Sequence, residues 1–225
     1  MKKSYRKKYL LTFSKSEALF EEDQTLEKPK PASDGTTISI SFSGAGKKYV
    51  NIKENKIILE EEIYGKEFLI TDTLQSYSWK LIDETKKIGE YTCYKAEVVI
   101  PVSEREKQVY KTYLEKTAKS QKAPLFPMQE PTDKIKTAWY TPDIPVSLGP
   151  DNYFGLPGLI LELSDEKTII LCSKVTLNTK SNFKIKPPGE GKKVSQKEFD
   201  AIQKKKTEQL MDEDGVINFS STTEE

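Results

Sequence analysis

The sequence contains no histidine among its 225 residues and has only two cysteines, Cys93 and Cys172. Histidine is the commonest general base and metal ligand in proteins, so its absence excludes a Ser-His-Asp triad, a Cys-His pair and a His-rich zinc site within this chain. Two thiols are also too few for a four-cysteine zinc site. Carboxylate, Ser-Lys or Tyr chemistry stays open, but no motif supports it. We therefore predict a protein that is not an enzyme and holds no metal or cofactor.

Long apolar runs and an excess of one charge are missing as well. Leu156 to Leu161 is among the longest apolar runs, and Pro157 and Gly158 interrupt it, so we expect no transmembrane segment. Lys and Arg total 36 against 35 Asp and Glu, so we expect no nucleic-acid partner. The basic start MKKSYRKKYLLTF lacks the apolar stretch of an export signal. Either the protein is cytoplasmic, or it is a mature domain whose signal has been trimmed.

The residues that are present alternate between apolar and polar along most of the chain. Such a period of two is typical of strands with one buried face, and turn residues separate the runs. Helical patterns do not stand between these runs, which argues against a parallel sheet. We predict a mainly β (α+β) fold with one curved antiparallel sheet, or half-barrel, of about ten strands. The predicted strands are 8–14, 38–42, 48–52, 56–63, 66–71, 77–82, 91–100, 134–140, 159–164 and 168–177.

Two segments have the apolar spacing of amphipathic helices. The first covers about 103–122. The second covers 196–211, where Ser195 and Glu198 fit a capping box. Composition favours one domain over 1–215, followed by a frayed tail at 216–225.

The segment between Tyr140 and Leu159 contains many Pro and Gly residues and is long for a connection inside a domain. Its apolar side chains would otherwise face water, so we expect the loop to pack against the sheet. The structural turn is assigned to Gly155, Pro157 and Gly158, with a type II turn at Pro157-Gly158.

Apolar and aromatic residues in and around this loop are the candidates for binding a ligand or a partner, because such side chains offer apolar area with a polar edge. The alternative is that they serve core and loop packing. The carboxylates Asp143, Asp151 and Glu162 lie nearby, but nothing in the sequence fixes their separation for acid/base chemistry. The binding candidates are Trp79, Trp139, Tyr140, Tyr153, Phe154 and Leu156.

The string Gly155-Leu156-Pro157-Gly158-Leu159-Ile160 resembles the motif that names the GLPGLI family. These are envelope proteins of unknown function from Bacteroidetes-type bacteria. The resemblance implies a GLPGLI-type domain with its extreme N-terminal part trimmed, and it transfers no catalytic residues. A weaker likeness, used only as a fold analogy, connects the strand pattern to the lipoprotein-carrier half-barrel superfamily. The resemblance extends to the segments 10–20, 79–96, 138–163 and 192–199.

A family of envelope proteins implies a location in the periplasm or at the outer membrane. There we expect a non-enzymatic binding or accessory protein that acts with an outer-membrane or periplasmic assembly. The alternative is a carrier or sensor of a hydrophobic ligand, lipid or peptide, held in a half-barrel cavity. An enclosed apolar cavity would favour the carrier, and an open strand edge would favour a protein partner.

Both cysteines fall on predicted strands and on the side opposite the predicted core face. In an exported protein they are candidates for a disulfide between Cys93 and Cys172. In a cytoplasmic chain they would be two free, half-buried thiols.

Overall fold

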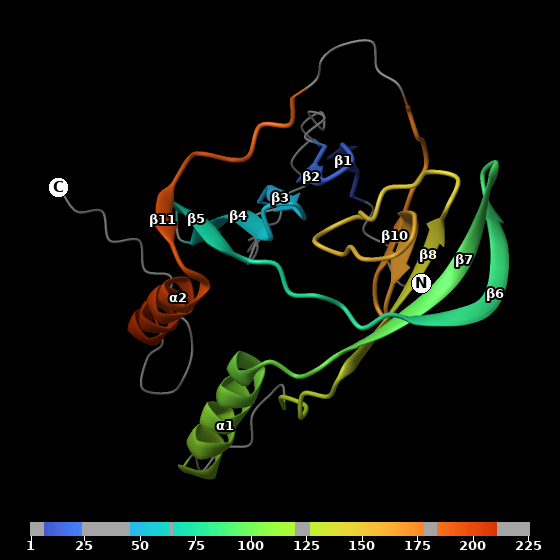
Figure 1. Cartoon of the computed structure of the whole chain (residues 1–225). Coiled ribbons are helices and arrows are strands. Elements are labelled where there is room, and N and C mark those ends of the chain that lie inside the picture. Colours follow the sequence, from blue (N-terminus) through green and yellow to red (C-terminus); the bar gives the residue numbers. More distant parts are fainter. Residues whose placement is uncertain (1–6, 24–45, 64, 120–126, 178–183, 211–225) are drawn as a thin grey trace, which may run out of the picture. The chain divides into compact units, whose positions relative to one another are not determined.

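The computed structural model describes residues 7–23, 46–63, 65–119, 127–177 and 184–210 (Figure 1). Two compact units make up the chain, Met1–Gln75 with Thr179–Glu225, and Ser76–Asn178. The single domain expected over 1–215 stays a prediction. The tail at 216–225 and the predicted strand at 38–42 lie outside the described residues.

The first unit is built on a six-stranded sheet in the order β1-β2-β3-β4-β5-β11. Neighbouring strands in the chain pair antiparallel, whereas the short last strand runs parallel to β5. The expectation of a wholly antiparallel fold is therefore wrong at this edge. The strands are β1 (Tyr9–Phe13), β2 (Glu17–Glu22), β3 (Lys48–Asn51), β4 (Lys56–Ile63), β5 (Lys66–Thr73) and β11 (Lys192–Val194).

Helix α2 (Gln196–Leu210) follows β11 and packs on the sheet of this unit. Its start is a capping box: the Ser195 N–H donates to the Glu198 carboxylate at 2.7 Å, and the Glu198 N–H donates to Ser195 Oγ at 3.3 Å. Phe199 then meets Phe68 edge to face, with ring centroids 5.5 Å apart. The helix predicted at 196–211 is confirmed.

The second unit is a five-stranded antiparallel sheet in the order β10-β9-β8-β7-β6. Helix α1 (Glu104–Lys119) follows β7 and confirms the helix predicted at about 103–122. Its cap is Ser103, whose Oγ accepts from the Glu106 N–H at 3.2 Å. The strands are β6 (Lys80–Ile88), β7 (Tyr91–Ile100), β8 (Lys134–Thr141), β9 (Leu159–Ser164) and β10 (Ile169–Leu171).

The described residues thus form eleven strands in two sheets, neither closed into a barrel, in place of one sheet of about ten strands. In the first sheet β11 lies beside β5, although β6 is the strand that follows β5 in the chain. β6 is instead an edge strand of the second sheet. Alternation along the chain marks the strands, but it carries no information on which strand is whose neighbour.

The core face expected for β7 is correct in its second half and wrong in its first. Ala96 and Val98 are buried, but Thr92 and Tyr94 are exposed, and Cys93 is fully buried. A bulge in the pairing with β6 interrupts the register between Ile82 and Thr85. Because β7 is long and strands twist, its two halves bury opposite sides.

The predicted disulfide is also wrong, since both cysteines are free. Cys93 lies on β7, while Cys172 follows β10 and pairs with β9, so β8 and β9 stand between the two positions. Three strand spacings amount to about 14 Å, and a disulfide needs Cα atoms within about 7 Å.

Candidate functional site

The loop at 142–158 is fastened to the five-stranded sheet by its own backbone. The Leu159 N–H donates to the Ile144 carbonyl at 3.0 Å, and the Ile160 N–H donates to the Leu148 carbonyl at 3.0 Å. Ile144 and Leu148 are buried, with 4% and 1% of their surface exposed. A further bridge pairs Leu148 with Phe154. The loop is packed, as predicted.

The turn residues of the loop act differently from the expected type II turn. That turn needs a positive φ at Gly158, whereas the positive φ in this loop falls on Gly155, at 99°, and on Asp151. Gly158 is instead required for space, because a Cβ there would lie 2.1 Å from the Thr141 carbonyl oxygen. Gly158 therefore lets the end of the loop pack closely against the end of β8.

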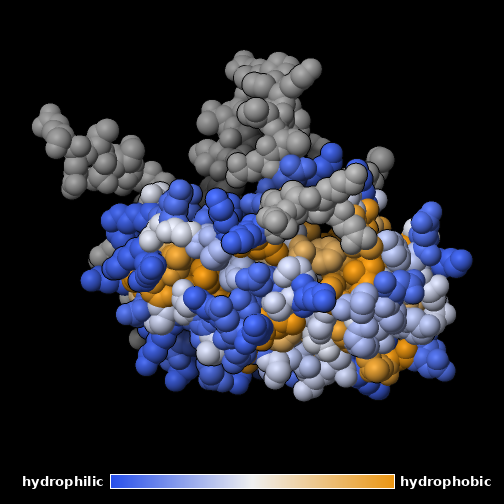
Figure 2. All heavy atoms as spheres, turned by 45° about the horizontal axis from the view of Figure 1, so that its top comes forward, coloured by the Kyte–Doolittle hydropathy of each residue, from blue (hydrophilic) through white to orange (hydrophobic). Residues whose placement is uncertain are grey.

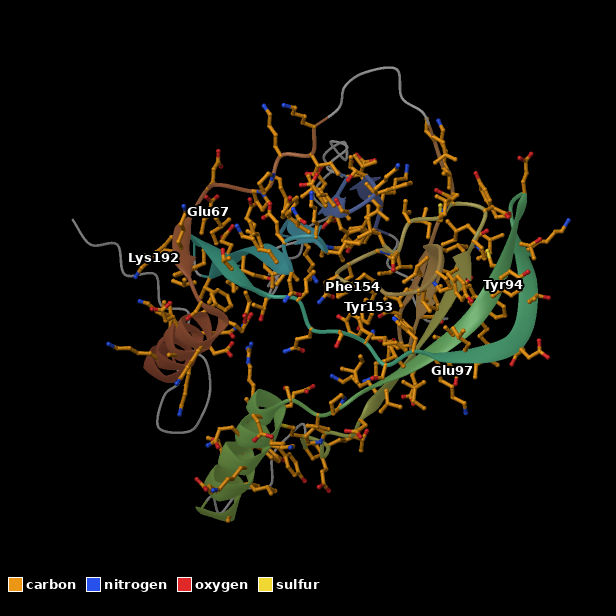
Figure 3. All side chains as sticks on the ribbon, viewed as in Figure 1. Glu67, Tyr94, Glu97, Tyr153, Phe154 and Lys192 are labelled. Carbon is orange, nitrogen blue, oxygen red and sulfur yellow. The ribbon has the colours of Figure 1, made fainter. Side chains whose placement is uncertain are left out.

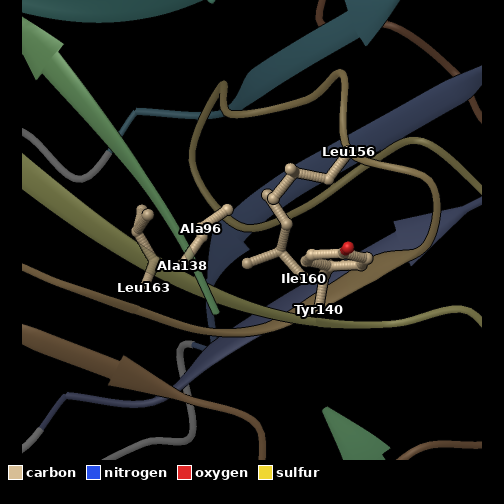
Figure 4. Close-up of a cluster of buried hydrophobic side chains, with 6 residues drawn as sticks. All are labelled: Ala96, Ala138, Tyr140, Leu156, Ile160 and Leu163. Carbon is tan, nitrogen blue, oxygen red and sulfur yellow. The ribbon is translucent and has the colours of Figure 1, made fainter. Parts of the chain in front are cut away.

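Two of the predicted binding residues, Tyr140 and Leu156, lie in the core beneath the loop (Figure 4). Leu156 is 1% exposed and Tyr140 is 6% exposed. Burial, and the neighbouring Tyr94, raise the pKa of the Tyr140 hydroxyl. These two side chains hold the loop on the sheet and offer almost no surface to a ligand. The cluster consists of Ala96, Ala138, Tyr140, Leu156, Ile160 and Leu163.

Four rings, Tyr77, Trp79, Tyr153 and Phe154, pack together at the edge of this core, and we call them the aromatic clasp. Tyr77 stacks on Tyr153 with centroids 4.9 Å apart and meets Phe154 edge to face at 5.6 Å. The Trp79 Nε1–H donates to the Phe154 carbonyl at 2.8 Å. Tyr153 and Phe154 lie together on the loop in Figure 3. The clasp joins the loop to the segment that leads into β6.

The clasp contains one residue that sequence reasoning missed. Tyr77 alternates with Trp79 in a predicted strand, and this spacing was the available signal. Burial raises the pKa of Tyr153 to about 12 and also raises the pKa of Tyr77. Both phenols therefore stay protonated near neutral pH, and neither is suited to act as a general base.

Trp139 lies on the other face of the sheet, because neighbouring residues of a strand point to opposite sides. The Lys86 Nζ lies 4.2 Å from the centroid of its indole ring and 2.7 Å from the Glu162 carboxylate. Cys93 pairs with Lys86 in the sheet, and burial raises the pKa of its thiol. The predicted aromatic set is therefore divided between two faces and forms no single pocket.

The outer edge of this sheet is β10, and its backbone groups alternate in direction. The Cys172 N–H donates to the Leu161 carbonyl of β9 at 2.7 Å. In an antiparallel ladder, residues that bond to the neighbouring strand alternate with residues that do not. Ile170 therefore turns its N–H and C=O towards β9, whereas Ile169 and Leu171 turn theirs outward. Within the described ranges no strand pairs with that outer side.

The side chains of the same two residues are exposed. Ile169 is 68% exposed and Leu171 is 56% exposed, on one face of the strand. Figure 2 shows hydrophobic residues reaching the surface in separate patches among hydrophilic ones. An uncharged strand with free backbone groups and exposed apolar side chains is a template for another strand.

Metal-binding clusters, membrane helices and cavities give weaker evidence of a functional site. Among the described residues, no three His, Cys, Asp or Glu side chains gather as they would around a metal ion, and no helix is long and apolar enough to cross a membrane. A groove of about 610 Å³ opens in the six-stranded unit. It includes Lys56 and Lys193, but its apolar members Ile58, Leu69 and Val194 are 6%, 3% and 8% exposed. The groove is an open, mixed surface and has no enclosed apolar interior.

Comparison with known proteins places part of the chain in a family model. Residues 79–162 match the model of a Bacteroidetes-type family described as "Protein of unknown function (Porph_ging)", which covers β6 to most of β9. The GLPGLI name is not confirmed by this match. No curated protein matches. A solved structure described as "Structure of PNGF-II in C2 space group" shares 14% identity with a TM-score of 0.49; the alignment covers 90% of this chain and 30% of that one, and a likeness this slight carries no argument.

Proposed function

We propose that this chain is a non-enzymatic binding or accessory protein of the cell envelope, which joins a periplasmic or outer-membrane assembly by accepting an extended protein strand at β10. The observation that carries the proposal is the outer side of β10, where Ile169 and Leu171 combine outward backbone groups with exposed side chains. The resemblance to the GLPGLI family supports the location in the envelope.

Strand addition uses both the outward backbone groups and the exposed side chains of Ile169 and Leu171. Main-chain hydrogen bonds to a sheet edge supply affinity, and alternate side chains supply specificity. Natural edge strands are usually protected by charges, and β10, with the sequence Ile-Ile-Leu, has none. The other edge of the same sheet, β6, contains Lys80, Asp83, Glu84, Lys86 and Lys87.

Proline scanning of β10 tests the proposal. Leu171→Pro removes an outward N–H and leaves the pairing with β9 intact, so the fold should survive while strand addition is lost. Ile170→Pro is the matched control, because it removes an inward N–H and should destabilise the hairpin. The measurement is binding of a displayed library of ten-residue peptides.

Selection of peptides with alternating apolar residues by the native chain, with loss of their binding in a folded Leu171→Pro protein, is the expected result. Equal binding by both proteins would refute the role of β10.

The second candidate function, a carrier or sensor of a hydrophobic ligand, has one observation in its favour. The groove of the six-stranded unit is within the size range of small-molecule sites, and Lys56 and Lys193 could face an anionic head group. Native mass spectrometry with palmitate tests it. An adduct that Lys56→Glu and Lys193→Glu abolish would favour a carrier, and the absence of an adduct would remove this candidate.

A further inference from the structure

One segment of the six-stranded unit lies on its sheet without bonding to it. Residues 184–189, which we call the strap, are the last part of the orange chain that leads into β11 (Figure 1). Among the described residues, no hydrogen bond or ion pair joins the strap to the sheet. Its contacts are apolar: Pro188 is buried, and Ile185 packs against a buried cluster, the strap cluster. This cluster consists of Tyr49, Ile58 and Leu69.

Two glycines at the end of the strap suit a hinge. No atom lies within 4 Å of the position that a Cβ would take at Gly189, and Gly191 adopts a φ of 105°, which favours glycine. At Gly191 a Cβ would lie 2.9 Å from the carbonyl carbon of Glu67, so the chain is held closely against β5 from there on. A segment with few buried contacts and no hydrogen bonds opens locally more readily than the sheet beneath it.

The groove of about 610 Å³ in this unit ends at the strap. Ile58 and Leu69 belong both to the strap cluster and to the lining of the groove, and Pro188 lines the groove as well. While Ile185 lies on the strap cluster, the groove therefore has little apolar surface to offer. Lifting the strap would extend the groove over the whole cluster.

We propose that the strap is a lid, which opens about Gly189 and Gly191 and admits the hydrocarbon chain of a lipid with an anionic head onto the strap cluster. The inference rests on the second candidate function, since it states how that groove is opened and closed. Lys56 and Lys193 of the groove would then face the head group. The carboxylate of Glu198 also lines the groove, but it already accepts the Ser195 N–H at the start of α2.

Thiol labelling in the full chain tests the opening, because a buried cysteine reacts only when its cover moves. Ile58→Cys places a thiol under the strap, and Ile57→Cys is the matched control, since neighbouring residues of a strand point to opposite faces. Ile58 and Ile57 are 6% and 7% exposed. The thiol at 58 should react about tenfold faster than the thiol at 57. Adding Ile185→Ser should accelerate labelling at 58 about tenfold further and leave labelling at 57 unchanged. Equal rates at the two positions, or no response to Ile185→Ser, would overturn the lid.

A second measurement needs no substitution in the sheet. Oxidative footprinting of native protein and Ile185→Ser compares Tyr49, which is 5% exposed, with Tyr140 of the other unit, which is 6% exposed. Oxidation of Tyr49 alone should rise in the variant, and an unchanged Tyr49 would overturn the lid.

Palmitate separates this inference from the function on which it rests. The expected result is an adduct in native mass spectrometry together with slower labelling of Ile58→Cys, because the bound chain covers the thiol. A strap that opens without any adduct removes the carrier and the ligand named here. An adduct in a chain whose positions 57 and 58 react equally keeps the carrier and overturns the lid.

Discussion

The two faces of the five-stranded sheet differ in what covers them. On one face, the loop at 142–158 closes over a filled core, and the aromatic clasp fastens its far end. On the other face, Lys86, Trp139 and Glu162 form a half-buried polar layer. Further out on this face, Ile169 and Leu171 of the edge strand stay exposed.

The comparison separates side chains that pack the chain against itself from side chains that stay exposed. The closed face contains the Gly155 to Ile160 string and five of the six predicted binding residues, all except Trp139, and there these residues hold the chain to itself. Exposed apolar side chains of this sheet include Ile169 and Leu171 at the edge, besides Leu81, Val99 and Ile135 on other strands. A conspicuous sequence motif can therefore mark a packed loop, while the partner surface that we propose is a short strand without a motif.

The largest effect should come from opening the closed face. Leu156→Ala removes a side chain that is 1% exposed, and truncation of a buried leucine costs about 2 to 5 kcal/mol of the free energy of unfolding. Chemical denaturation of native and variant protein measures the loss. A cost below about 1 kcal/mol would mean that the loop does not cover the core in solution.

Sequence patterns located most strands and both helices because alternation and helical spacing are local. They failed where a distant partner decides the structure. β2 fully buries only Ala18 and Phe20 and has glutamates at both ends, and it becomes a strand because β1 and β3 flank it. β11 has three residues and pairs parallel to β5, far away in the chain.

The sequence predicts most residues of the candidate site but only part of their arrangement. Trp139 and Tyr140 are adjacent in sequence and were grouped together, but the pleat sends them to opposite faces. A single periodicity along all of β7 predicts that Cys93 lies away from the core, whereas the strand changes its buried side near the bulge. The edge at β10 was missed because Ile169 and Leu171 look like core residues in sequence.

The next effect concerns Asp165, in the hairpin between β9 and β10. Burial raises the pKa of its carboxyl, but Lys136 and the N–H groups of Lys167 and Thr168 outweigh this and hold it at about 2. A folded pKa below the unfolded one stabilises the protein above about pH 4, and the stabilisation disappears as the pH falls towards 2. It should amount to about 2 kcal/mol at neutral pH.

Unfolding free energies of native protein and Asp165→Asn between pH 7 and pH 2 test this, with Asp83→Asn on β6 as the matched carboxylate control. The expected result is that the difference between native protein and Asp165→Asn shrinks as the pH falls. A difference that is constant with pH would show that the charge of the Asp165 carboxylate does not stabilise the hairpin that leads to the open edge.

A smaller effect should follow from loosening the clasp. Trp79→Phe keeps an aromatic ring but removes the Nε1–H that reaches the Phe154 carbonyl, so about 1 kcal/mol should be lost. Amide exchange at Gly155, whose N–H donates to the Ser147 carbonyl, should quicken because the loop opens locally more often. Unchanged exchange would mean that the loop is held without the clasp.

The smallest effect should come from the same residue type on the open side. Leu171→Ala removes as many atoms as Leu156→Ala, but Leu171 is 56% exposed, so the monomer should lose no more than about 0.5 kcal/mol. The measurement is unfolding at low protein concentration. A large cost would show that Leu171 is covered within a single chain, and the contrast between the two sides of the sheet would no longer hold.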